Sequence, residues 1–175
     1  MKKQLLFVLI IILLLAPATA FADKTGFVDF GKVLELTDKG RQVQKQLAAT
    51  KDELEIKVQE MELGLRKLQD EIRTKADVMS EEVKQQKMEE FQKKMMEYQK
   101  AGQDYSMQFE KLRVEKIRGF VKDMEAVVQQ VAKEKGFSLV IMKFEDMVTN
   151  SSLILYGDSS VDLTDQVIQK LNAGK

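Results

Sequence analysis

The residue types that could do chemistry in this chain are almost entirely carboxylates and amines. Its 175 residues contain no His and no Cys, with 28 Lys and Arg set against 28 Asp and Glu. Without imidazole or thiol groups, metal sites rich in His or Cys and Ser-His or Cys-His nucleophiles are excluded. The sequence also lacks a Gly-rich phosphate loop and a pair of carboxylates set apart from the general charge. We therefore expect no enzyme activity, no catalytic residues, no cofactor and no metal site.

The overall charge gives no sign of a nucleic-acid partner. Removing Lys2 and Lys3 with the first 22 residues lowers the 28 basic residues to 26, against 28 acidic ones. The remaining chain is near −2, whereas nucleic-acid binding needs a concentrated basic excess. Charged residues make up 32% of the chain and the two signs are finely mixed, which is typical of a solvated helical surface.

The first residues have the pattern of a cleaved secretory signal. Lys2 and Lys3 precede an unbroken apolar run over residues 5–15, and an A-x-A site at Ala20 and Ala22 follows. A membrane anchor would need roughly 20 apolar residues, and this run is interrupted before that length. The absence of Cys excludes lipid attachment at an N-terminal Cys. We expect the protein to be exported and then released as a soluble chain.

The middle of the chain predicts two long helices. Residues 39–135 contain no Pro and are dominated by Glu, Lys, Gln, Leu and Met, which are strong helix formers. Apolar residues recur mostly in steps of three and four, the period of a coiled-coil seam. The first seam contains Leu47, Leu54, Val58, Met61, Leu65, Leu68 and Ile72, and the second contains Met88, Phe91, Met95, Tyr98, Tyr105, Phe109 and Leu112.

The two seams mirror each other as an antiparallel hairpin requires. Paired positions have numbers that sum to 156, which centres the turn near Val78. Ser80, followed by two acidic residues, is a suitable N-cap for the second helix. The predicted pairs are Leu47 with Phe109, Leu54 with Gly102, Val58 with Tyr98, Met61 with Met95, Leu65 with Phe91, and Leu68 with Met88.

The apolar seam changes phase after Leu112, and Gly119 lies inside the new seam. Two explanations remain open at this point. The helix could bend here, at the base of the arm, or it could turn its apolar face from its hairpin partner toward the rest of the protein. The sequence does not decide between them, nor whether Gly64 and Gly102 act as bending points.

The two ends of the chain predict a small β body. Residues 25–30, 137–142 and 153–156 have the composition of short strands. Gly136, preceded by basic residues, is expected to end the long helix. Thr164 is expected to cap a last helix that begins at Asp165.

The predicted fold class is α+β, with a long antiparallel coiled-coil hairpin projecting from a small β body. We assign residues 1–22 to the signal peptide, residues 39–135 to the arm, and residues 23–38 with 136–175 to the body. Three or four short strands make a thin core and leave sheet edges open. We therefore expect the chain to form a multimer.

Motifs at both ends resemble the Skp (OmpH) family of periplasmic chaperones. The opening strand K-T-G-F-V-D-F is followed by a long charged hairpin and then by A-K-E-K-G-F-S-L-V-I. The chain closes with I-L-Y-G-D and V-D-L-T-D-Q-V-I-Q-K-L. The resemblance covers essentially all of the chain after the signal peptide. The terminal motifs carry it, because the hairpin alone would match many coiled-coil rods.

The resemblance implies a periplasmic homotrimer in which the β bodies assemble and three arms surround a cavity. Unfolded outer-membrane proteins would be held in that cavity without ATP. We expect the trimer interface to contain Phe27, Val28, Leu139 and Val140. We expect diffuse client contacts at Met88, Met95, Met96, Tyr105 and Met107, because flexible Met-rich surfaces adapt to varied partners.

One departure from the family pattern limits these expectations. Better-known members are strongly basic, whereas this chain has a sequence pI near 6.4, so lipopolysaccharide binding is not carried over to any residue.

A structural or adaptor coiled-coil protein of the cell envelope is the alternative function. A membrane-surface role for residues 114–131 is disfavoured by their narrow apolar face and mixed charge. We expect no stable membrane insertion.

Overall fold

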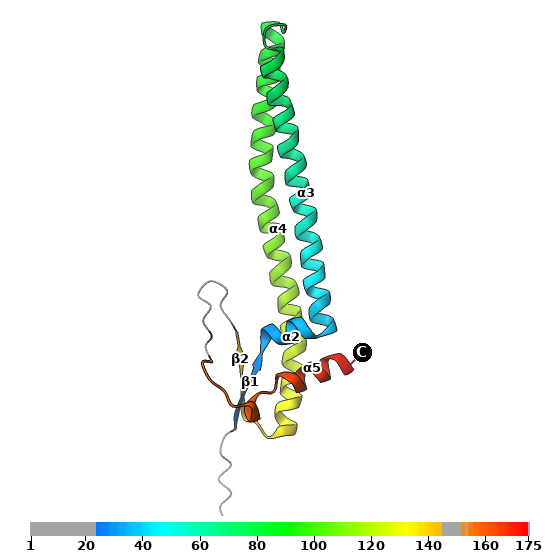
Figure 1. Ribbon diagram of the computed structural model, residues 1–175, viewed down its shortest axis with the longest axis vertical. Coiled ribbons are helices and arrows are strands. Elements are labelled where there is room, and N and C mark those ends of the chain that lie inside the picture. The colour runs from blue at the N-terminus through cyan, green and yellow to red at the C-terminus, as the bar shows by residue number, and fades with distance from the viewer. Residues whose placement is uncertain (1–23, 145–151, 153, 175) are drawn as a thin grey trace, which may run out of the picture.

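The computed structural model describes residues 24–144, 152 and 154–174. Its elements are β1 (Thr25–Asp29), α2 (Phe30–Leu36), α3 (Asp38–Lys75), α4 (Glu81–Lys135), β2 (Leu139–Lys143), the 3-10 helix η1 (Ser159–Val161) and α5 (Thr164–Ala173). Helices α3 and α4 lie side by side as a long arm, and the strands and short helices gather around the lower end of α4 (Figure 1). The signal-peptide prediction for residues 1–22 lies outside the described residues.

The predicted hairpin turn and helix ends are confirmed. Helix α3 ends at Lys75 and α4 begins at Glu81, so the turn is centred on Val78. The Ser80 side chain accepts a hydrogen bond from the Val83 backbone N–H, as an N-cap does. At the other end of α4, Gly136 has a φ of 71°, a left-handed conformation that favours glycine.

Two predicted pairs of seam residues lie next to each other in the structure. Leu54 and Gly102 line one hollow between the helices, and Val58 and Tyr98 line another. Near the turn, Glu71 and Lys87 form an ion pair between the two helices, with Oε2 and Nζ 3.3 Å apart.

Burial along the seam is uneven. The first helix buries its seam at Leu54, Leu65 and Leu68, whereas Met88 on the second helix is 46% exposed. The predicted seam position of Met88 is therefore only partly covered. In an arm of two helices no third element covers the outer side of such a residue.

A pair of cysteines tests this register. Under mild oxidation, Met61→Cys with Met95→Cys is expected to cross-link within one chain, because facing seam positions come within disulfide range. The pair Leu54→Cys with Met95→Cys is expected not to link, because seven residues of offset are about 10 Å along a helix. Mass spectrometry of tryptic digests measures both. Linkage of the offset pair alone would show that the 156 register is wrong.

The body is built around a two-stranded parallel sheet. Strand β1 pairs with β2 in the register Thr25 with Leu139 through Asp29 with Lys143. On the other side of β1, the Leu163 backbone N–H donates to the Phe27 carbonyl at 2.9 Å. The core beneath the sheet joins all parts of the body with the base of the arm, and its buried members are Val28, Phe30, Val33, Val43, Phe120, Met124, Val131, Phe137, Leu163 and Val167.

Helix α4 continues from the arm into the body without a break (Figure 1). It passes through Gly119, and the residues that follow, Phe120, Met124 and Val131, are buried in the body core. This favours the second explanation of the phase shift, in which the apolar face turns from α3 toward the body.

Two predicted elements at the chain ends are wrong in detail. The first strand stops at Asp29, and Phe30 begins α2, which the sequence did not predict. The Asp29 side chain ends the strand by capping this helix, accepting from the Lys32 N–H at 3.1 Å. The predicted strand over 153–156 is absent at residues 154–156, where Leu155 is 93% exposed. Leu153 lies outside the described residues.

Thr164 is not the N-cap of the last helix. It is the first helical residue of α5, and its backbone N–H donates to the Asp162 carboxylate at 2.9 Å. The Asp162 carboxylate therefore accepts a hydrogen bond from the first backbone N–H of the helix, in a turn that begins two residues before the helix. Thr164 Oγ1 instead accepts from the Asp29 N–H at 2.9 Å and ties α5 to β1.

Candidate functional surfaces

The arm presents methionines outside its seam. Met96 and Met107 are each 64% exposed on α4, and Met95 is half-buried in the seam. Tyr105 is also half-buried and borders a hollow of about 410 Å³ that contains Leu54. The five residues predicted to contact clients are therefore spread along one helix at several depths, and the structure does not bring them into one pocket.

Gly102 lines two hollows of the arm, one beside Tyr105 and one beside Met107. It occupies a seam position where other turns carry Phe91, Met95 or Phe109. A Cβ built at Gly102 would have no neighbouring atom within 4 Å, so the space that a large side chain would fill stays open. The hollow on the Met107 side measures about 620 Å³.

The body carries a second apolar surface along β2. Leu139 is 54% exposed, and Ile141, Met142 and Phe144 are also exposed. Of the residues predicted at a subunit interface, Phe27 and Val140 are half-buried. Val28 is only 1% exposed and belongs to the core of the single chain, so its side chain has no surface to offer a partner.

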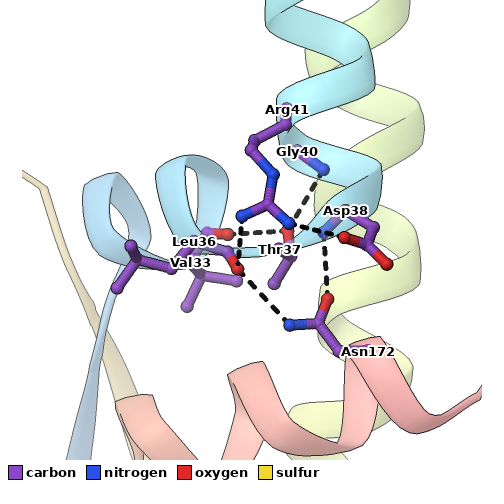
Figure 2. Close-up of polar contacts among 7 residues, drawn as sticks. All are labelled: Val33, Leu36, Thr37, Asp38, Gly40, Arg41 and Asn172. Atoms are coloured by element: carbon purple, nitrogen blue, oxygen red, sulfur yellow. Dashed lines mark hydrogen bonds and ion pairs between the residues drawn. The ribbon is translucent and has the colours of Figure 1, made fainter.

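A polar joint fixes the base of the arm to the C-terminal helix (Figure 2). The Asn172 side chain of α5 donates from Nδ2 to the Leu36 carbonyl at 3.3 Å and accepts at Oδ1 from the Asp38 N–H at 2.9 Å. One amide therefore satisfies the end of α2 and the start of α3 together. Thr37 adds to the joint, because its Oγ1 donates to the Val33 carbonyl and accepts from the Gly40 N–H.

The joint also depends on a close approach of backbones. A Cβ built on Gly40 would lie 2.1 Å from the Leu34 carbonyl oxygen. Only glycine allows α3 to start this close to the end of α2. The joint is not predicted from the sequence, although Thr37 followed by Asp38 is a recognisable helix start.

Charge on both parts of the molecule is paired at the surface. Hydrogen bonds from Lys75 and Lys87 hold the pKa of Glu71 below its usual value. A hydrogen bond from Lys170 lowers the pKa of Glu134 and links α5 to the end of α4. A carboxyl with a lowered folded pKa stabilises the fold above its unfolded pKa and loses that contribution as the pH falls. These groups are exposed, so the effect on stability is small.

The described part of the chain contains no group of three or more acidic side chains that could hold a metal ion. Nor is any helix within residues 24–144, 152 and 154–174 long and apolar enough to cross a membrane.

The comparison with protein families decides the identity of the fold. The model of the family described as outer membrane protein (OmpH-like) matches residues 24–171. This range contains every described element from β1 through most of α5. The chain belongs to the OmpH-like family.

A solved structure has the same OmpH-like fold. It is a proposed outer membrane chaperone (OmpH-like) from Caulobacter crescentus CB15, with a TM-score of 0.71 and 15% sequence identity. The match covers 86% of this chain and 85% of that chain. No match was found among curated proteins. At 15% identity this likeness shows the fold alone, which is a long helical hairpin on a small body. The surfaces of this OmpH-like chain are therefore described from its own residues.

Proposed function

We propose that this OmpH-like protein is an ATP-independent holdase chaperone of the periplasm that binds unfolded outer-membrane proteins. Membership of the OmpH-like family supports the proposal, as does the fold shared with a proposed outer membrane chaperone. Residues 1–22 would direct export and be removed. The proposal includes neither catalysis nor lipopolysaccharide binding.

The observation that carries the proposal is the exposure of two methionines on an otherwise charged arm. Met96 and Met107 expose most of their side chains to solvent, although burying apolar groups would be favourable. Met side chains are flexible and fit many partner shapes. Client contacts would be diffuse and would involve Met88, Met95, Met96, Tyr105 and Met107.

The working form in this proposal is a homotrimer. Exposed apolar residues along β2, including Leu139 and Ile141, would be covered when bodies associate. The β body of residues 23–38 and 136–175 would then be the association domain, and the arms of residues 39–135 would project around a shared cavity. A client in that cavity would contact arms from more than one chain, and weak contacts would add by multivalency.

The proposal predicts suppression of aggregation. An outer-membrane barrel protein is denatured in urea, mixed with this protein without its signal peptide, and diluted into buffer without nucleotide. The barrel protein is expected to stay soluble. Light scattering measures the effect, and several unrelated unfolded chains should be held. Binding to a single folded envelope partner at fixed stoichiometry, with no suppression of aggregation, would favour the adaptor function.

A further inference from the structure

One flank of α4 carries six uncharged residues over four turns, with Lys100 at its edge. Its residues recur at helical steps of three and four, and the last two are adjacent residues at three and four positions from the same glutamine, so they form one stripe beside the seam. We call this stripe the neutral flank, and it consists of Gln92, Met96, Gln99, Gln103, Ser106 and Met107. Of the charged residues in the same stretch, Lys94, Glu97 and Asp104 lie off this stripe, whereas Lys100 borders it one helical turn from Met96. In a chain that is 32% charged, such a stripe is unusual.

The hollow beside Gly102 opens on the neutral flank. Its volume is about 620 Å³, and its lining consists of Val58, Tyr98, Gln99, Gly102, Gln103, Ser106 and Met107. None of these side chains is charged. The hollow of about 410 Å³ around Leu54 shares Val58, Gly102 and Ser106 with it. By contrast, a hollow of about 400 Å³ next to Gly64 is lined by Lys57, Glu60, Lys94 and Glu97 among others.

We propose that the neutral flank binds an extended segment of an unfolded polypeptide, with one large apolar side chain of that segment in the hollow at Gly102. The inference rests on the proposed chaperone function and adds one defined contact to the diffuse client contacts proposed above. From Gln92 to Met107 the flank is about 22 Å long, at 1.5 Å per residue. That length matches about six or seven extended residues of a client.

The chemistry of the flank suits a peptide backbone. Each Gln side chain offers donors and an acceptor, as does each peptide unit of an unfolded chain. A charged flank would have to lose hydration to admit an uncharged segment, which is costly. A third packed helix is a poorer occupant, because a coiled-coil seam needs an apolar residue at nearly every contact position. Here Gln and Ser stand between Met96 and Met107.

A charge-balanced double variant tests the flank. Gln99→Glu with Gln103→Lys adds an i, i+4 ion pair of the favourable order, so the helix is expected to keep its stability. Its affinity for a denatured outer-membrane barrel protein labelled with a fluorophore is expected to fall about tenfold. The matched control is Gln86→Lys with Gln108→Glu, which makes the same two types of change off the flank. The control is expected to bind like the original chain.

A second variant tests the hollow without adding charge. Gly102→Leu fills the open space and replaces glycine within a helix, so the melting temperature is expected to rise. Affinity for the same labelled protein is nevertheless expected to fall about tenfold, because the hollow that takes the client side chain is lost. Loss of binding with a more stable arm cannot come from unfolding.

The outcomes separate this inference from the proposed function. If the original chain binds no unfolded barrel protein, the proposed function is wrong. If it binds, and the two flank variants bind as well as the control, the client lies elsewhere and the neutral flank is not its site. An equal loss in the control and in the flank double variant would also overturn the inference.

Discussion

A Gly40→Ala chain is expected to be less stable than the original by about 1–3 kcal/mol, the usual cost of forcing atoms into a filled space. The added Cβ would lie 2.1 Å from the Leu34 carbonyl oxygen and within 2.8 Å of two further backbone atoms. Backbone cannot rotate away as a side chain tip can, so α2 and α3 must separate. That movement would also weaken the hydrogen bonds from Asn172 that join them.

Gly64→Ala provides the control, with the opposite sign. Gly64 lies in the same helix, and a Cβ there meets nothing within 4 Å, so alanine should stabilise α3 by roughly 0.5–1 kcal/mol. Thermal melts followed by circular dichroism at one protein concentration measure both variants. A Gly40→Ala chain that melts at or above the original temperature would contradict the described joint.

Leu139→Asp is expected to convert the proposed trimer into monomers. Leu139 is 54% exposed on the single chain, so the substitution leaves the fold of one chain largely untouched. In an assembled body the new carboxylate would be buried without a partner, which costs several kcal/mol. Light scattering combined with size-exclusion chromatography measures the mass, and circular dichroism checks that helix content is retained.

Gln169→Glu is the matched control for the trimer test. It adds the same charge at an exposed position of α5 and should leave the assembly intact. A folded monomer for the original chain at micromolar concentration would rule out the trimer. Persistence of the trimer in the Leu139→Asp chain would instead place the interface on another surface.

The proposed assembly and the proposed client surface would meet different physical demands. In a trimer the body would bury apolar strand residues, whereas the folded arm leaves Met96 and Met107 exposed. Seam burial at Leu54, Leu65 and Leu68 and exposed ion pairs such as Glu53 with Lys57 support the arm without using its neutral flank. A substitution can therefore stabilise the arm and still weaken client binding, as is expected for Gly102→Leu.

The arm can be predicted from the order of its residues. The turn at Val78, the N-cap at Ser80 and the left-handed Gly136 depend on residues within one or two helical turns of each other. The spacing of Leu54, Val58 and their partners extends the same information along two helices. Such features follow from local conformational preferences and from the repeated spacing of apolar residues. Both can be recognised in the amino-acid sequence.

The arrangement of the body depends on contacts between segments that are far apart in the sequence. The hydrogen bond between Asn172 and Asp38 joins residues 134 positions apart. The residues around either position do not predict that contact. We expect Val28 at a subunit interface from the sequence. In the structure its side chain is buried within one chain, in the same core as Phe120 and Leu163. The apolar residues Leu155 and Tyr156 suggest a strand but remain exposed, because a strand also requires a neighbouring strand at its edge. Which distant segments come together is set by the packing of the whole body, and that information is not contained in any local pattern.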